Sequence, residues 1–344
     1  MTSSHSNAQH ANTWQDLVLL TRIHTTPMRL VFTNAGVHKT LSTIPHTHAL
    51  SVPDTCVLHA QKQHTKQVWH LIYLNHENTP AAQNTQRLSI TIDPHVHITL
   101  LESYVGTESD VYQHATHTDI TLEEHAALEH VILVQQSDRA TSQIETHVHV
   151  RTHANYKRTH LSYLGKEETS HTHVYLESPH SQCALSGVVL GYNDQIRTHN
   201  THVHHKAAHT TSHQLYKNIA SNHARVSYAG VIDIEQHAPK TQAYQYAHNL
   251  ILHKSAHAHA EPHLKILTDD VICKHGATVG KINHDALFYL RSRGLSEKEA
   301  MGMLVSAFAA EPLAHITDSH MLHYAQETLT TLLQHVFDPK ETSR

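Results

Sequence analysis

The run His147-Val148-His149-Val150 alternates histidine with valine, and similar alternation returns at His171-Thr172-His173-Val174-Tyr175 and at His202-Val203-His204. Alternation with a period of two is typical of strands that bury one of their two faces. The pattern dominates residues 57–282, where helical spacing is nearly absent. The sequence therefore predicts a mainly β fold in which histidine occupies the strand face opposite the β-branched residues.

Similar units recur within this region, each with a polar turn, a small residue and then an alternating strand. They occupy residues 124–133, 152–161, 179–190 and 222–232, and the first three lie slightly under about 30 residues apart, a period typical of solenoid repeats. In a solenoid, each coil stacks its strands on those of the coil before it. A β-sandwich explains the alternation equally well, so the pattern alone leaves both folds open.

The two ends of the chain have other patterns. Residues 14–23 predict a short helix, and a strand is expected around residues 29–32. Helical spacing begins again after Asn283 and continues towards the C-terminus. We therefore divide the chain into an N-terminal segment (1–55), a β core (56–282) and a C-terminal helical domain (283–344).

The C-terminal region carries the signals of three helices. The first is expected to stop at Gly294, since glycine is common just past a helix end. Ser296 and Glu299 have the spacing of a capping box, which predicts the start of the second helix. We expect Pro312 to follow the end of this second helix, and a third helix to span residues 318–336.

The composition narrows the class of protein. Of the 344 residues, 39% are hydrophobic and only 16% are charged, while 42 are histidine. The 25 basic residues do not outnumber the 30 acidic ones, so no basic surface for nucleic acid is expected. No apolar run is long enough for a membrane span, and the first residues lack the pattern of a signal peptide. Three widely spaced cysteines favour a reducing compartment, so we expect a cytoplasmic protein.

The segment Cys273-Lys274-His275-Gly276 is the first candidate site. On a strand, Cys273 and His275 would project from the same face about 6–7 Å apart, close enough to share a metal ion or the edge of a cluster. A structural zinc site needs about four ligands, and a cluster needs several thiolates. The pair therefore predicts half of a site that a second chain completes. A buried cysteine beside a turn histidine is the alternative.

The histidine excess suggests a second function. Histidines at alternate strand positions point the same way, and stacked coils would build ladders of imidazoles that could bind zinc, nickel or iron. A histidine-rich protein that buffers metal ions without a partner is thus the alternative function. Exposed strand positions need only be polar, however, so most of these histidines require no metal.

No self-contained active site is recognised. Lys39 and Thr40 follow His38, whereas a phosphate-binding loop needs a glycine before the lysine. The carboxylate pairs that a glycosidase requires are also missing from the strands. We therefore expect a protein without catalytic activity of its own.

Three longer segments carry a family resemblance: HQLYKN at residues 213–218, DDVICKHGATVG at 269–280 and ALFYLRSRG at 286–294. In their order and content, they resemble the SufB/SufD family of the Suf system for iron–sulfur cluster assembly, from about residue 87 to residue 333. The C-x-H-G form of Cys273 to Gly276 is more similar to the SufD branch, as is the lack of cysteine in residues 240–252.

The resemblance implies a right-handed parallel β-helix with a helical C-terminal domain, acting as a non-catalytic scaffold subunit of a SufBCD complex. SufB would pair through the β-helix, and the ATPase SufC would bind the C-terminal helices and hydrolyse ATP. His275, with Cys273 as its neighbour, would face SufB where iron or a nascent cluster is held transiently, and the isolated chain would bind no cofactor stably. The free chain could form a homodimer. The implied SufC-docking residues are Asp285, Leu287, Phe288, Tyr289, Arg291, Arg293, Gly294 and Phe308.

Overall fold

The computed structural model describes residues 28–33, 36–37, 42, 49–52, 55–75, 84–106 and 111–337. The helix predicted for residues 14–23 lies outside these ranges. The described chain consists of strands as far as Lys281, followed by three helices. Among the helices of this described part, none combines the length and apolar character that crossing a membrane requires.

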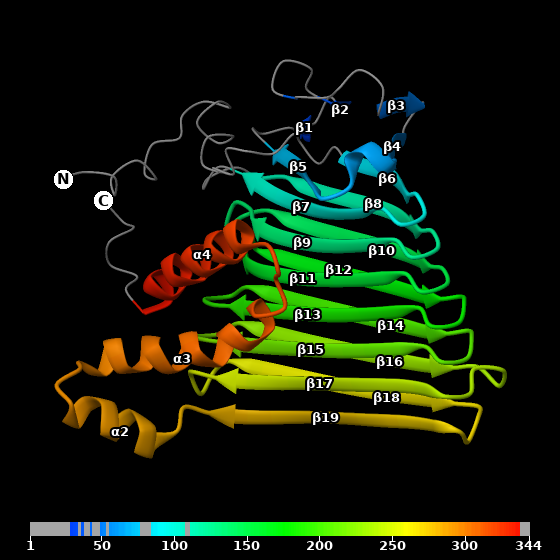
Figure 1. The fold of residues 1–344 in the computed structure, drawn as a ribbon. Helices are drawn as coiled ribbons and strands as arrows, with labels where there is room; N and C mark the ends of the chain where they lie inside the picture. The colour runs from blue at the N-terminus through cyan, green and yellow to red at the C-terminus, as the bar shows by residue number, and fades with distance from the viewer. Residues whose placement is uncertain are drawn as a thin grey trace.

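The strands form two stacked sheets (Figure 1). The first has ten strands, in the order β19-β17-β15-β13-β11-β9-β7-β5-β1-β2, and the second has nine, in the order β18-β16-β14-β12-β10-β8-β6-β4-β3. The first sheet contains β1 (Met28–Thr33), β2 (Gly36–Val37), β5 (Gln67–Asn75), β7 (His97–Gly106), β9 (Ala127–Gln135), β11 (Asn155–Leu164), β13 (Gln182–Gly191), β15 (Thr211–Ala220), β17 (Thr241–Ile251) and β19 (Val271–Lys281). The second contains β3 (Ala49–Val52), β4 (Thr55–Ala60), β6 (Asn84–Ile92), β8 (Gln113–Leu122), β10 (Thr141–Val150), β12 (Glu167–Leu176), β14 (Ile196–His205), β16 (Arg225–Ile234) and β18 (His257–Ile266).

From β4 onwards the chain alternates between the sheets, and each strand pairs in parallel with the next strand of its own sheet. Thr159 of β11, for example, pairs with Ser186 of β13, and Ser186 pairs with Leu215 of β15. Parallel pairing between successive coils defines a β-solenoid and excludes the sandwich. Among the described strands, only β1–β2 and β3–β4 pair antiparallel. The predicted strand near Arg29 is β1, which joins the first sheet beside β5.

Tight turns connect the coils. His95, His125, His153, His180 and His209 have positive φ angles of 55–63° in successive turns, and their rings stack at centroid distances of 4.7–5.0 Å. Imidazole ladders are thus present, as predicted, including one at the turns. Three of the four repeat units lead into strands of the first sheet. The fourth, residues 222–232, instead leads into β16 of the second sheet, because turns on both edges of the solenoid share the same polar pattern.

The main core lies between the sheets and extends from Met28 to Ala256. Alternation places Val148, Val150 and Val174 in this core, whereas His147 and His173 lie on the outer face. The prediction that histidine occupies the outward positions fails inside the solenoid. Fully buried histidines also face inwards, and charged side chains accompany them; this interior set includes His130, His160, His199, Glu102, Glu168, Arg158 and Arg197.

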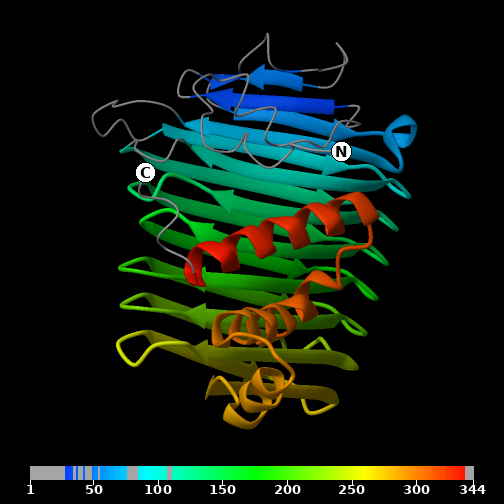
Figure 2. The same ribbon diagram turned by 90° about the vertical axis from the view of Figure 1, so that its left-hand side faces the viewer.

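The helices are α2 (His284–Ser292), α3 (Glu297–Leu313) and α4 (Ser319–Phe337), with a short 3-10 turn η2 (Lys62–His64) nearer the N-terminus. Helices α3 and α4 cover the outer face of the first sheet, and α2 contacts α3 (Figures 1 and 2). Apolar residues of α3 and α4, including Val305 and Leu329, pack there against strand residues such as Leu133 and Leu161. A carboxylate oxygen of Glu129 accepts a hydrogen bond from the backbone N–H of Thr317 at 2.6 Å, which anchors the α3–α4 connection to β9.

The predicted helix ends are largely confirmed. Ser296 and Glu299 form the expected capping box of α3, and Gly294 has a positive φ of 97° just past α2. Pro312, however, lies inside the last turn of α3 and does not follow its end. Its side chain is buried, and this packing compensates for the backbone hydrogen bond that a proline cannot donate.

Candidate functional site

Cys273 and His275 lie on β19, the last strand of the solenoid. The predicted strand is present, so the two side chains project from the same face. Cys273 pairs in register with the buried Ala243, and His275 pairs with the buried Gln245. Both residues therefore continue the inward-facing rows of β17, but they lie on the last coil of the described structure. His275 is exposed, and Cys273 is half-buried.

Among the described strands, β18 and β19 each have a neighbour on one side only. Unpaired strand edges offer their backbone N–H and C=O groups to another chain. Large apolar side chains accompany the edge: Leu267, Ile272 and Val279 are exposed by 55%, 51% and 60%. This open end has the chemical character of a surface that another protein covers.

Partial burial raises the pKa of the Cys273 thiol, so the thiol form is favoured at neutral pH. Among the described residues, neither Cys273 nor His275 belongs to a group of three side chains that could hold a metal ion. The half-site stays a prediction. Within the described part of this chain, the pair contributes two potential ligands.

The predicted docking residues divide into two groups. The α2 helix has no buried residue, and its Phe288 and Tyr289 are 74% and 57% exposed. Asp285, Arg291, Arg293 and Gly294 are likewise exposed, whereas Leu287 is half-buried. Phe308, by contrast, packs on the sheet from α3 and lies 4.8 Å beneath the Lys217 ammonium. The geometry thus separates an accessible α2 surface from a residue that anchors α3.

Three other groups bring histidines and carboxylates close enough to hold a metal ion: His173–His202–His204, His117–Glu145–His147 and His160–Glu168–His199. The third is wholly buried between the sheets. Nε2 of His160 lies 2.9 Å from the Glu168 carboxylate, and Nε2 of His199 lies 3.2 Å from it.

Two buried arginines bring positive charge to this group: the Arg197 guanidinium interacts electrostatically with the Glu168 carboxylate, and Arg158 contacts His160. The Arg158 guanidinium donates a hydrogen bond to Nδ1 of His160 at 2.8 Å, so the proton of a neutral His160 sits on Nε2, facing Glu168. Burial lowers the pKa of His160 to about 3. Burial opposes ionisation of Glu168, but its contacts with His160 and His199 hold its pKa well below the usual range. The group is therefore an internally neutralised polar network.

Sequence reasoning missed this network. His160 and Arg158 occupy alternate positions of β11, and the only available signal was a strand whose inward positions are polar. Recognising it requires knowing which strand residues of the two sheets face one another, which depends on how the sheets stack.

Comparison with known proteins shows similarity to iron–sulfur cluster assembly proteins. The family model for the SufBD core domain of the SUF system for FeS cluster assembly matches residues 73–308. The iron–sulfur cluster assembly protein SufD of Escherichia coli is 36% identical over 154 residues, which is 44% of this chain and 36% of that protein.

Two relatives match over longer stretches. An iron–sulfur cluster assembly SufBD family protein of Synechocystis is 27% identical over 257 residues, covering 72% of this chain and 56% of the relative. The chloroplastic protein ABCI7 of Arabidopsis thaliana is 25% identical over 250 residues, covering 72% and 52%. The matched part thus spans between about a third and just over half of the length of these relatives. Because the family model covers most of the chain, from the second half of β5 into α3, the chain belongs to the SufB/SufD family of iron–sulfur cluster assembly proteins.

Proposed function

We propose that the chain is a SufD-like, non-catalytic scaffold subunit of a cytoplasmic complex that assembles iron–sulfur clusters. Its partners in this proposal are a SufB chain and the ATPase SufC, which hydrolyses ATP. The observation that carries the proposal is the open last coil of the solenoid, which presents Cys273 and His275 beside exposed apolar residues.

SufB would cover this open end. Pairing along the free edges of β18 and β19 would satisfy backbone groups and bury Ile272 and Val279. Iron or a nascent cluster is the cargo, and His275 with Cys273 would supply ligands from one side while SufB completes the set. An exposed imidazole and a thiol suit the borderline and soft character of iron–sulfur ligands.

SufC would bind α2. Phe288 and Tyr289 form an aromatic surface beside Arg293, whose guanidinium lies 5.2 Å from the Tyr289 ring, and exposed aromatic residues with arginine are typical of interface anchors. Asn283 caps the helix by accepting hydrogen bonds from the backbone N–H groups of Asp285 and Ala286, so α2 is formed before a partner arrives.

The cluster-contact role is tested with His275→Ala in the complex co-expressed with SufB and SufC. We expect cluster assembly to be lost while the far-UV circular dichroism spectrum is unchanged, because His275 is exposed. His263→Ala is the matched control, since His263 is an exposed histidine on the outer face of the same coil. Retained cluster yield in His275→Ala would show that this imidazole is not a cluster contact.

Partner binding is tested by co-purification with full-length tagged variants. Phe288→Ser with Tyr289→Ser should release SufC and retain SufB, whereas Ile272→Asp with Val279→Asp should release SufB. His323→Ser is the control, because His323 is exposed on α4 away from both surfaces. Point variants are preferable to removal of the helices, which would uncover Leu133, Leu161 and Tyr163. Loss of neither partner in its own variant would overturn the assignment of surfaces.

A further inference from the structure

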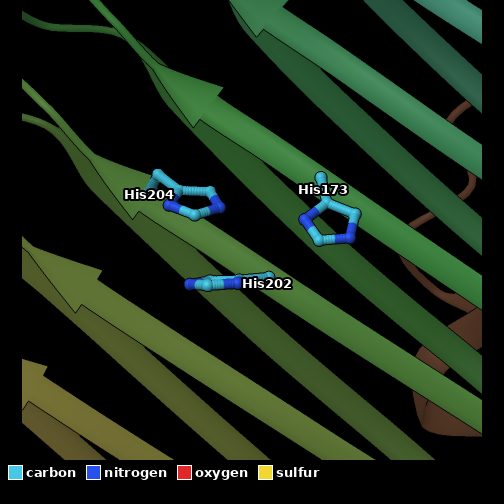
Figure 3. A group of neighbouring side chains, drawn as sticks. All are labelled: His173, His202 and His204. Carbon is cyan, nitrogen blue, oxygen red and sulfur yellow. The ribbon is translucent and has the colours of Figure 1, made fainter.

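The outer face of the second sheet carries a compact group of three histidines, His173 of β12 and His202 and His204 of β14 (Figure 3). Their nearest ring nitrogens, one from each residue, all lie within 4.8 Å of one another. The group is remote in sequence from Cys273 and His275, and it lies on the sheet that α3 and α4 do not cover (Figures 1 and 2).

The register of the sheet explains why the three rings meet. His202 and His204 are two residues apart on one strand, so their side chains leave the same face. His173 is the registered partner of His202 on the adjacent strand. The rings of His202 and His204 have centroids 3.7 Å apart, and the His173 ring lies 5.7 Å from His202 and 6.1 Å from His204.

Two of the ring nitrogens lack a hydrogen-bond partner within the described structure. Nε2 of His202 and Nε2 of His204 are shielded from solvent, and neither makes a hydrogen bond there. A shielded polar atom without a partner is costly, and a bound ion would remove that cost. The Asp233 carboxylate, held by Lys265 at 3.0 Å, lies 4.0 Å from Nε2 of His202 and adds negative charge beside the group.

The protonation state of the three histidines also favours the binding of a cation. Burial, reinforced by the neighbouring His202 and His173, lowers the pKa of His204 to about 4. Burial likewise lowers the pKa values of His173 and His202. All three imidazoles are therefore neutral at neutral pH, which is the form that ligates metals.

A second surface group, His117–Glu145–His147, provides a contrast. There the Glu145 carboxylate already lies 3.2 Å from Nδ1 of His117 and 2.9 Å from Nε2 of His147. Both of these histidines thus contact one carboxylate at short range, whereas Nε2 of His202 and Nε2 of His204 make no hydrogen bond in the described structure.

We propose that His173, His202 and His204 form a binding site for one divalent transition-metal ion of the zinc class, with water completing the coordination. Three imidazoles are a ligand set that zinc accepts with an open fourth position, and nitrogen donors favour late transition metals over magnesium or calcium. The proposal does not depend on the scaffold function and concerns a different part of the fold.

The test uses full-length protein stripped with a chelator and titrated with Co²⁺ at neutral pH, with binding followed by visible absorption and Zn²⁺ then used to displace the Co²⁺. We expect one Co²⁺ ion per chain to bind tightly, and any further Co²⁺ ions to bind more weakly. His204→Gln and His202→Gln should each weaken that site by more than about tenfold, because loss of even an outer-shell partner of a metal site costs about 10–100-fold. His173→Gln provides a third, independent variant.

His171→Gln is the matched control, since His171 lies on the same strand and face as His173 but outside the group. It should keep the tight site. Circular dichroism and urea unfolding of the stripped variants verify that the fold is retained. The proposal is overturned if several ions bind with equal, weak affinity whose number is unchanged in His204→Gln, or if His171→Gln loses as much affinity as the ligand variants do.

Discussion

The ammonium group of Lys217 on β15 lies 2.8 Å from the carboxylate of Glu311 on α3. Lys217 is almost wholly buried and also covers the ring of Phe308 at 4.8 Å. One basic side chain therefore joins α3 to the solenoid by both charge and packing. Because Phe308 takes part in this attachment, it is less available to a partner than Phe288 and Tyr289 are.

Glu311→Gln should lower the free energy of unfolding by about 1 kcal/mol, because it leaves the charge of the buried Lys217 without its partner. The effect is moderate because the Glu311 side chain itself is well exposed. Urea unfolding measures the change. Glu297→Gln is the control, because its pair with Arg291 is exposed on both sides and should contribute about 0.5 kcal/mol or less. Equal effects of the two substitutions would contradict the anchoring role of Lys217.

The same pair predicts a pH dependence. The hydrogen bond from Lys217 is the main cause that holds the pKa of Glu311 below its usual range. A carboxyl group whose pKa is lowered in the folded state stabilises the fold above its unfolded pKa and loses this effect as the pH falls through the folded value. The stability difference between the parent and Glu311→Gln should therefore be constant near neutrality and shrink in acid. A difference that grows on acidification would refute the assignment.

The buried network predicts a larger effect at Glu168. Glu168→Ala leaves the buried Arg197 without the carboxylate that interacts with it, and should cost about 3–5 kcal/mol. Glu167→Ala, one residue earlier and facing outwards, should change stability by about 0.5 kcal/mol or less. Chemical denaturation of both variants tests this difference, and a mild effect at Glu168 would mean that the network is not a structural requirement.

The positive φ angles of the stacked turn histidines predict that stability depends on which residue occupies these positions. His153 has a φ of 55°, and β-branched residues strongly disfavour this region. His153→Val should destabilise the fold by about 1–2 kcal/mol, whereas His153→Asn should be tolerated because asparagine visits this conformation readily. His171→Val, on an exposed strand position, should be nearly neutral. The comparison fails if valine and asparagine at position 153 unfold at the same denaturant concentration.

The three cysteines should differ in reactivity. Cys56 and Cys183 are buried, and burial raises the pKa of Cys56 to about 11 and that of Cys183 further still. Cys273 is only half-buried. A thiol reagent should thus label one site rapidly in the native chain and all three after denaturation. Cys273→Ser should abolish the rapid phase; a rapid phase that survives in this variant would assign it to another thiol.

Local patterns account for much of the fold. The alternation at His147 to Val150 specifies a strand, and the Ser296–Glu299 spacing specifies a helix start, because these preferences depend on neighbours within a few residues. The family resemblance then favoured a solenoid where the alternation alone allowed a sandwich. Pro312 shows where local reasoning fails: a proline is expected after the end of a helix, but here it lies buried in the last turn of α3.

The sequence by itself therefore determined the strands, the turns, the helix caps and the positions of Cys273 and His275 on one face of a strand. Only the tertiary structure decided that β18 and β19 form an open end, that His160 and Glu168 meet inside the solenoid, and that His173 reaches His202 and His204. The reason is physical. A strand specifies which residues share a face, but the register between coils and the packing of the helices decide which faces meet and which stay exposed.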